Sequence, residues 1–157
     1  MLRRCVVGSL CGFAILLGGT LAWSKAAPKP TAAKIKWEKD IFKAHDVAVA
    51  TGKPMLVIVT ATWCGPCQKL KKSTLSHPQI AEFVNASFVP VQVDFDRDEK
   101  IAAILEVEQV PASMVLSPES DLLGRLDGYV SVKKYRAMLK QSRRLQSEIR
   151  QAKHSDD

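Results

Sequence analysis

A short apolar run that leads directly into two closely spaced cysteines constrains this chain more than any other feature. Residues 55–61 read Met-Leu-Val-Ile-Val-Thr-Ala and contain no charged residue. A continuous run of this length, rich in β-branched residues, predicts a strand buried on both faces, as in the centre of a parallel sheet. Residues 64–76 follow with helical spacing, and Cys64 and Cys67 lie at their start. We therefore expect a buried strand that turns into a helix at the cysteine pair.

The other apolar patterns predict a single α/β domain. Alternation of strands and helices implies parallel pairing, whereas two late strands joined by a short turn at 117–121 imply an antiparallel hairpin. Together they predict a central mixed sheet of about four strands with helices on both faces. The predicted helices cover 37–51, 64–76, 79–86, 96–108 and 131–149, and the predicted strands cover 55–61, 88–94, 112–116 and 122–126.

The composition supports one globular core and gives no sign of nucleic-acid binding. The chain has 157 residues, of which 46% are hydrophobic and 25% are charged, so enough apolar material exists to bury a core. The formal net charge is +7, but part of it comes from three basic residues in the first 26 positions. The remaining positive charge is mild and spread along the chain, so we expect no nucleic-acid partner.

The first 26 residues have the pattern of an export signal. Arg3 and Arg4 supply positive charge, residues 5–23 are uncharged and mostly apolar, and Ser24 and Ala26 fit a small-x-small cleavage site. An uncleaved membrane anchor is the alternative, since an apolar run of this length can just span a bilayer. A lipoprotein is a third alternative, although the residues before Cys11 do not fit a lipidation box. All three interpretations place the rest of the chain outside the cytoplasm, as a periplasmic or secreted protein that contacts the membrane only through an anchor.

Composition shifts divide the remainder of the chain into three parts. Residues 27–36 are rich in Pro, Ala and Lys and are predicted to form an extended linker. Residues 37–142 hold the predicted domain, and 143–157 form a basic helical extension and tail. The acid-rich segment 94–99 is interpreted as a strand end followed by a helix start, in preference to a metal-binding loop.

The position of the cysteine pair favours redox chemistry. Unpaired N–H groups and the helix dipole at a helix N-terminus stabilise the Cys64 thiolate, and Cys67 lies one turn further on, within reach of the same sulfur. This arrangement predicts two-step thiol–disulfide exchange. A structural disulfide is an alternative, but so short a loop would stabilise the fold little. A zinc site is another, but its further ligands would have to come from three scattered histidines, so we expect no metal and no cofactor.

Val110 and Pro111 stand directly before the third predicted strand. A proline at a strand start is usually an edge or entry residue. Its position alone therefore gives little reason to expect a cis peptide bond.

These motifs together resemble the thioredoxin superfamily. The resemblance covers residues 37–142 and rests on the Trp-Cys-Gly-Pro-Cys motif at 63–67, on Val110-Pro111, and on Gly128 before the last helix. The segments 51–57 and 75–94 are similar to the secreted thioredoxin-like branch that includes the C-terminal domain of the thiol:disulfide interchange protein DsbD.

The resemblance implies a thioredoxin-like fold and a role for each motif. Cys64 would be the nucleophile and Cys67 the resolving thiol, and the two would form the redox disulfide Cys64–Cys67. The Val110–Pro111 bond would be cis, and the Val110 backbone would pair with the substrate chain. The substrate groove would be bordered by Trp63, Gly65, Pro66, Val110 and Pro111.

The resemblance also implies an activity and partners. The Gly-Pro dipeptide at 65–66 resembles that of reducing thioredoxins, so we expect a thiol:disulfide oxidoreductase that reduces protein disulfides. A reductant outside the cytoplasm needs an electron donor, for which a membrane protein is the expected source. The alternatives are an oxidase or isomerase of secreted proteins, or a non-catalytic thioredoxin-like binding module.

Three positions depart from the family pattern. Ile58 stands where thioredoxins usually carry a buried aspartate, Pro90 stands where they carry a nearby lysine, and Ala112 replaces a common threonine. In the family, this aspartate accepts the proton of the resolving thiol. Without it, the proton of Cys67 needs another acceptor, whereas the exchange reaction itself still requires only the two cysteines.

Overall fold

The computed structural model describes residues 34–155, so the predicted export signal and most of the predicted linker lie outside the described residues. The order of elements is the predicted one, except that the cysteine helix is divided into α2 and a π-helical segment, η1. The elements are α1 (Ile41–Thr51), β1 (Met55–Thr60), α2 (Gly65–Lys69), η1 (Leu70–Leu75), α3 (Pro78–Ser87), β2 (Val89–Asp94), α4 (Glu99–Ile104), β3 (Ala112–Leu116), β4 (Leu122–Asp127) and α5 (Val132–Ser155).

The four strands form one mixed sheet in the order β2-β1-β3-β4. The central strand β1 pairs in parallel with β2 and antiparallel with β3, and β3 pairs antiparallel with β4. The predicted mixed sheet and its late hairpin are therefore confirmed. Within residues 34–155, no helix is both long enough and apolar enough to cross a bilayer.

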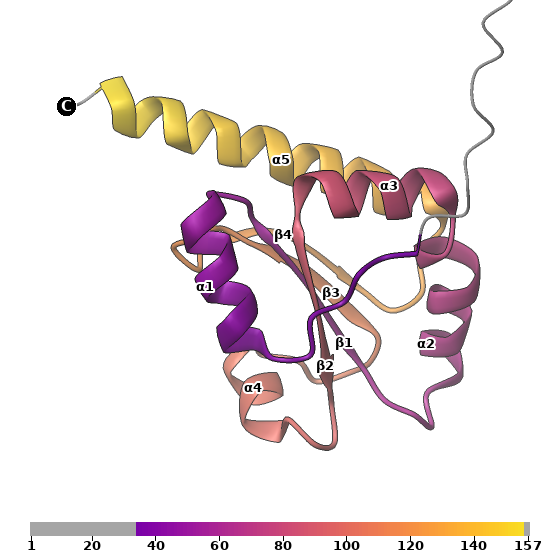
Figure 1. The fold of residues 1–157 in the computed structure, drawn as a ribbon. Helices are drawn as coiled ribbons and strands as arrows, with labels where there is room; N and C mark the ends of the chain where they lie inside the picture. The colour runs from indigo at the N-terminus through magenta and orange to yellow at the C-terminus, as the bar shows by residue number, and fades with distance from the viewer. Residues whose placement is uncertain (1–33, 156–157) are drawn as a thin grey trace, which may run out of the picture.

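Helices cover both faces of the sheet, as predicted (Figure 1). All six residues of β1 are buried, because alternate side chains enter two different cores. Met55, Val57 and Val59 pack on the side of α1 and α4. Leu56 and Ile58 pack on the side of α2, α3 and α5. The strand predicted to be buried on both faces is thus the middle layer of the domain.

Local hydrogen bonds fix where α1 begins and ends. The Asp40 carboxylate accepts hydrogen bonds from the backbone N–H groups of Phe42 (2.9 Å) and Lys43 (3.2 Å), which is the usual way to cap a helix start. Gly52 ends the helix with a left-handed conformation, φ +64°, which glycine adopts without steric cost. The turn places Met55 at the start of β1.

The last helix, α5, runs without interruption for 24 residues. The predicted border between domain and extension, at 142/143, falls inside it. Beyond that border Gln146 is only 2% exposed, and Ile149 packs against the core. Near its end, Lys153 forms an ion pair with Glu119 of the β3–β4 turn at 3.4 Å. The basic helical extension therefore packs against the domain along much of its length.

Candidate redox site

The cysteine pair lies where β1 passes into α2. Cys64 is the N-cap residue of α2, Cys67 lies in its first turn, and the two sulfurs are joined in a disulfide. Gly65 and Pro66 occupy the first helical positions, where the missing N–H of proline breaks no intrahelical hydrogen bond. The strand-to-helix turn predicted from the sequence thus forms at the cysteines.

The surroundings of Cys64 favour a negative charge on its sulfur once the disulfide is reduced. The backbone N–H of Cys67 donates to Cys64 Sγ at 3.1 Å. The start of the helix also directs its dipole toward this atom. Both cysteines are nearly buried, with Cys64 2% and Cys67 0% exposed. The difference between the two sulfurs therefore lies in hydrogen bonding and helix position more than in burial.

Two segments distant in sequence converge on the disulfide. The Val110–Pro111 peptide bond is cis, the isomer that the family resemblance implies. The Val110 carbonyl oxygen lies 3.6 Å from Cys64 Sγ, and the Pro111 carbonyl accepts a 2.7 Å hydrogen bond from the Gly128 N–H. Gly128 has φ +77°, a backbone conformation that favours glycine. The three motifs that carried the resemblance are therefore neighbours in space.

Trp63 extends from one side of this site. Its side chain is 67% exposed, and its indole Nε1–H donates to the Asp96 carboxylate at 2.8 Å. Asp94 in turn accepts hydrogen bonds from the Asp96 and Arg97 backbone N–H groups, which holds the loop in place. From the sequence, this acidic segment is predicted only to be a strand end followed by a helix start. No spacing in the sequence indicates its contact with Trp63, because the two residues lie 33 positions apart.

Tyr129 lies on another side of the site, directly after Gly128. It is 38% exposed, and Lys69 Nζ lies 4.4 Å from the centroid of its ring, a cation–π contact. Ser73 of η1 donates to the Tyr129 hydroxyl at 3.4 Å, and Thr74 donates to the Val130 carbonyl at 2.8 Å. These bonds fasten the loop before α5 to the cysteine helix. Neither Tyr129 nor Lys69 belongs to a motif that points to this site in the sequence.

Residues 41–143 match the family of thioredoxin-like domains. The chain belongs to this family. It is 26% identical over 141 residues to the thioredoxin-related protein DsbJ of Chlamydia pneumoniae, a match that covers 82% of this chain and 40% of that protein's length. The fold is similar to that of a Thermus thermophilus thioredoxin, with a TM-score of 0.63 and 25% identity over 69% of this chain and 86% of that one. It is also similar to the oxidised DsbD C-terminal domain of Neisseria meningitidis, with a TM-score of 0.58 and 22% identity over 68% of this chain and 98% of that one.

The thioredoxin-like fold gives the cysteine pair its chemical context. A disulfide between Cys64 and Cys67 lies at the start of α2 in a domain of the thioredoxin-like family. Among residues 34–155, no group of three His, Cys, Asp or Glu side chains is placed to hold a metal ion. Two of the three histidines considered as zinc ligands, His45 and His77, lie outside the cysteine helix α2. His45 Nε2 lies 3.1 Å from the Pro118 carbonyl oxygen, and His77 precedes α3.

Ile58 and Pro90, which stand where thioredoxins usually carry a buried aspartate and a lysine, are both buried. Ile58 is 0% exposed and pairs with Gln92 of β2 and Ser113 of β3. Pro90 lies on the outer strand, where its carbonyl accepts a hydrogen bond from the Glu38 N–H. Apolar side chains thus fill both positions.

The same core contains a buried hydroxyl group, that of Tyr135. The side chain of Tyr135 is fully buried, and its hydroxyl faces Ser113 without a hydrogen bond of ordinary geometry. Burial raises the pKa of Tyr135 well above its usual value, so the side chain stays neutral.

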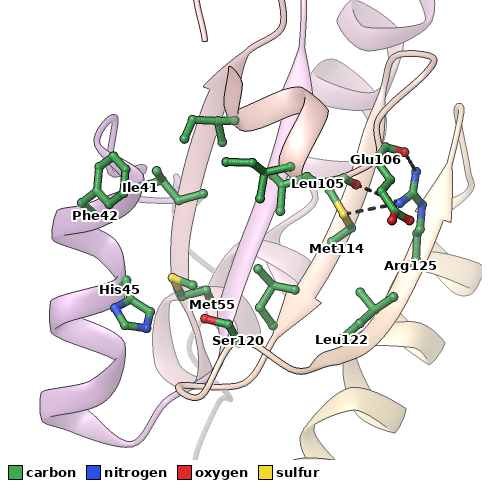
Figure 2. A pocket seen from close by; sticks show the side chains of 13 residues that line it. Ile41, Phe42, His45, Met55, Leu105, Glu106, Met114, Ser120, Leu122 and Arg125 are labelled. Carbon is green, nitrogen blue, oxygen red and sulfur yellow. Dashed lines mark hydrogen bonds between the residues drawn. The ribbon is translucent and has the colours of Figure 1, made fainter. Parts of the chain in front are cut away.

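An apolar cavity, which no pattern in the sequence predicts, lies toward the other end of the sheet. It has a volume of about 540 Å³ and an apolar lining that comes from α1, α4 and three strands (Figure 2). Met55 lies at the start of β1 and Leu116 at the end of β3, whereas the cysteines follow the end of β1. Arg125 lies at its edge, where its guanidinium donates to the carbonyls of Leu105 and Glu106. This cavity is therefore separate from the redox site.

Proposed function

We propose that this protein is an extracytoplasmic thiol:disulfide oxidoreductase that reduces disulfides in other proteins. The observation that carries the proposal is the placement of Cys64 at the start of α2, with its sulfur beside the Val110 carbonyl and the cis Pro111. Both the similarity to thioredoxins and the Gly-Pro dipeptide support a reducing direction.

The proposed reaction has two exchange steps. In the first, the Cys64 thiolate attacks one sulfur of the client disulfide, a mixed disulfide forms, and the other client sulfur leaves and takes up a proton. In the second, the Cys67 thiol loses its proton and attacks Cys64 Sγ, which releases the second client thiol. Two electrons pass from the protein dithiol to the client, and the Cys64–Cys67 disulfide of this structure is the product.

Each residue of the proposed groove has a task in these steps. The Val110 backbone pairs with the client chain and holds its disulfide against Cys64. Trp63, Gly65 and Pro66 are all exposed and border the groove. Pro111, which follows Val110 in a cis peptide bond, has no backbone N–H of its own to bind the client chain.

The proposed location rests on the start of the chain, and the proposed electron donor depends on that location. The charged, apolar and small-residue pattern at 1–26 supports export. Outside the cytoplasm, a membrane protein that carries reducing equivalents would restore the dithiol. N-terminal sequencing of the protein from its native host tests the location. A start near Ala27 is expected, whereas a Met1 start in the membrane fraction would establish the anchor.

Insulin reduction, measured alongside the reduction potential of the cysteine pair, tests the activity. We expect catalysed reduction and a potential nearer the value of about −270 mV typical of thioredoxin than the value of about −120 mV of DsbA. A potential near the DsbA value without insulin reduction would identify an oxidase. Full biological function in a Cys64→Ser/Cys67→Ser double variant would identify a binding module.

Single cysteine variants test the assigned roles. Cys67→Ser should accumulate mixed disulfides with client proteins, because only the second step is lost, and Cys64→Ser should accumulate none. Non-reducing gels of extracts from cells that express each variant give the measurement. Equal trapping by both variants would contradict the two-step assignment.

A further inference from the structure

One flank of the proposed groove is built from segments that carry no acid. Residues 64–76, which include α2 and η1, and residues 131–147, the first part of α5, contain several Lys and Arg residues and no Asp or Glu. The positive charge is spread along the sequence, but folding gathers it. Thr74 of η1 bonds to the Val130 carbonyl, and Arg136 of α5 donates to Gln79 of α3 at 3.2 Å. The cations therefore share one side of the molecule.

This basic flank is continuous with the groove. Pro111 accepts the hydrogen bond of Gly128, Tyr129 is the next residue, and Lys69 lies over the Tyr129 ring. The ring thus bridges the strand start beside the disulfide and the first lysine of the flank. The flank comprises the exposed residues Lys69, Lys72, Lys133, Lys134 and Arg136.

The charges of the flank are not neutralised by the chain itself. Within the described part of the chain, ion pairs join Arg97 to Asp98, Arg125 to Asp127, Arg144 to Glu148 and Lys153 to Glu119, and none includes a residue of the basic flank. On the Trp63 side, by contrast, the groove meets the acidic loop that contains Asp94 and Asp96. The two sides of the groove therefore carry opposite charge.

We propose that the basic flank docks an acidic segment of the client protein, next to the client cysteine that Cys64 attacks. This proposal rests on the proposed function and adds a client class to it. Unpaired cations at the groove attract an acidic segment over several ångströms and raise the rate of productive encounter. The acidic loop on the other side repels the same segment, so the client is oriented as well as attracted.

An acidic protein segment fits these observations better than an anionic membrane. Lys69 contacts Tyr129, which follows the residue bonded to Pro111, so whatever binds at Lys69 lies beside the client chain. A client carries its own flanking residues to this position in every encounter. A lipid surface is the competing occupant, and vesicle binding is measured below to test it.

Two matched peptides measure the preference. Each carries one cysteine as a mixed disulfide with thionitrobenzoate, flanked by glutamates in one peptide and by lysines in the other. Release of thionitrobenzoate from each is followed by stopped flow with the fully reduced protein. We expect the acidic peptide to react roughly tenfold faster at low ionic strength and the preference to collapse at high salt. The ratio of the two rates cancels any change in the reactivity of Cys64 itself.

Charge-reversal variants assign the preference to the flank. Lys69→Glu/Lys72→Glu should remove or invert the ratio, and Lys69→Arg/Lys72→Arg should retain it. The control Lys39→Glu/Lys43→Glu makes the same change in net charge at exposed positions on the α1 side of the sheet and should leave the ratio unchanged. An unchanged ratio in Lys69→Glu/Lys72→Glu, or equal losses in test and control variants, would overturn the proposal.

Two further outcomes distinguish this proposal from a failure of the exchange activity and from membrane binding by the flank. If neither peptide releases thionitrobenzoate with any variant, the proposed exchange activity fails, and the docking proposal fails with it. Sedimentation with vesicles that contain anionic phosphatidylglycerol gives the membrane arm. Vesicle binding that is lost in Lys69→Glu/Lys72→Glu, together with equal rates for the two peptides, would assign the flank to the membrane and overturn the client proposal.

Discussion

The two faces of the sheet are covered to very different degrees. On one face, α2, η1, α3 and α5 form a closed layer over side chains that include Leu56 and Ile58, both 0% exposed. On the other face, α1 and α4 form an open layer, which leaves the apolar cavity of about 540 Å³ and exposes 71% of Phe42 (Figure 2). The cysteine helix α2 belongs to the closed layer.

Helix length explains the difference. At about 1.5 Å per residue, the 24 residues of α5 span roughly 36 Å, whereas the six residues of α4 span only about 9 Å. The short α4 cannot cover both β3 and β4, so the open layer stays incomplete over them. The layer that positions the cysteines is therefore the more completely covered of the two. Substitutions in this layer should lower the free energy of unfolding strongly. Matched substitutions in the open layer should change it little.

A matched pair of isoleucines gives the largest expected contrast. Ile80 on α3 is 0% exposed, and Ile104 on α4 is 76% exposed. Ile80→Ala should lower the free energy of unfolding by about 2–5 kcal/mol, through lost burial and a residual cavity. Ile104→Ala should change it by less than about 0.5 kcal/mol. Urea melts of both variants provide the measurement, and similar losses would mean that the open layer is covered in solution.

Ile58→Asp tests the closed layer beside the redox site. The new carboxylate would be buried without a lysine partner, because Pro90 occupies that position, so stability should fall by roughly 2–4 kcal/mol. The same carboxylate should speed resolution of the mixed disulfide near neutral pH by supplying a local base. Denaturant melts and stopped-flow kinetics measure the two effects separately.

Ile58→Asn is the matched control for that experiment. It buries a polar group of similar size but supplies no base, so it should lose stability without faster resolution. Equal acceleration in both variants would assign the effect to loosened packing. If Ile58→Asp is slower or unchanged, Cys67 already loses its proton by another route, such as water.

The packed parts of this molecule were the ones that the sequence could predict. The run at 55–61 predicted a doubly buried strand because burial on both faces demands continuous apolar residues, and β1 has this property. The cysteine motif and Gly128 likewise act through local backbone geometry, so their positions could be expected from the resemblance.

The contacts that complete the site could not be predicted in this way. Trp63–Asp96 and Lys69–Tyr129 join exposed side chains on different elements, and such pairs leave no periodic pattern in the sequence. The predicted helix at 96–108 is also longer than α4. Asp94 and Asp98 side chains bind backbone N–H groups before the helix starts, and Glu106 with φ +52° follows its end. The cavity, whose lining includes Ile101 and Ile104 of α4, was not predicted either.

Gly124→Ala tests how closely α5 approaches β4. A Cβ atom at Gly124 would lie 2.5 Å from Ser142 Oγ and 3.3 Å from two atoms of Met138. We expect a loss of about 1–3 kcal/mol, because the closed layer must shift to accept the methyl group. Differential scanning calorimetry measures the loss. Adding Ser142→Ala should recover part of it, and no recovery would show that α5 and β4 are further apart than described.

The smallest expected effect lies at the start of α4, in the open layer, and it depends on pH. Hydrogen bonding by the Arg97 guanidinium at 3.0 Å holds the pKa of Asp98 below its ordinary value. A carboxyl whose pKa is lowered by folding stabilises the folded state above its unfolded pKa of about 4, and this contribution is lost as the pH falls through the folded value.

Arg97→Gln should therefore raise the Asp98 pKa, measured by NMR titration of its carboxyl carbon. The stability difference between the wild type and the variant should be present above about pH 4 and shrink as the pH falls. It should be small, because the Arg97 side chain is 66% exposed and solvent screens the pair. Arg144→Gln, which removes a similar exposed pair on α5, should leave the Asp98 titration unchanged. An Asp98 pKa that is the same in Arg97→Gln as in the wild type would show that the hydrogen bond from the Asp94 backbone N–H, and not this ion pair, lowers the pKa.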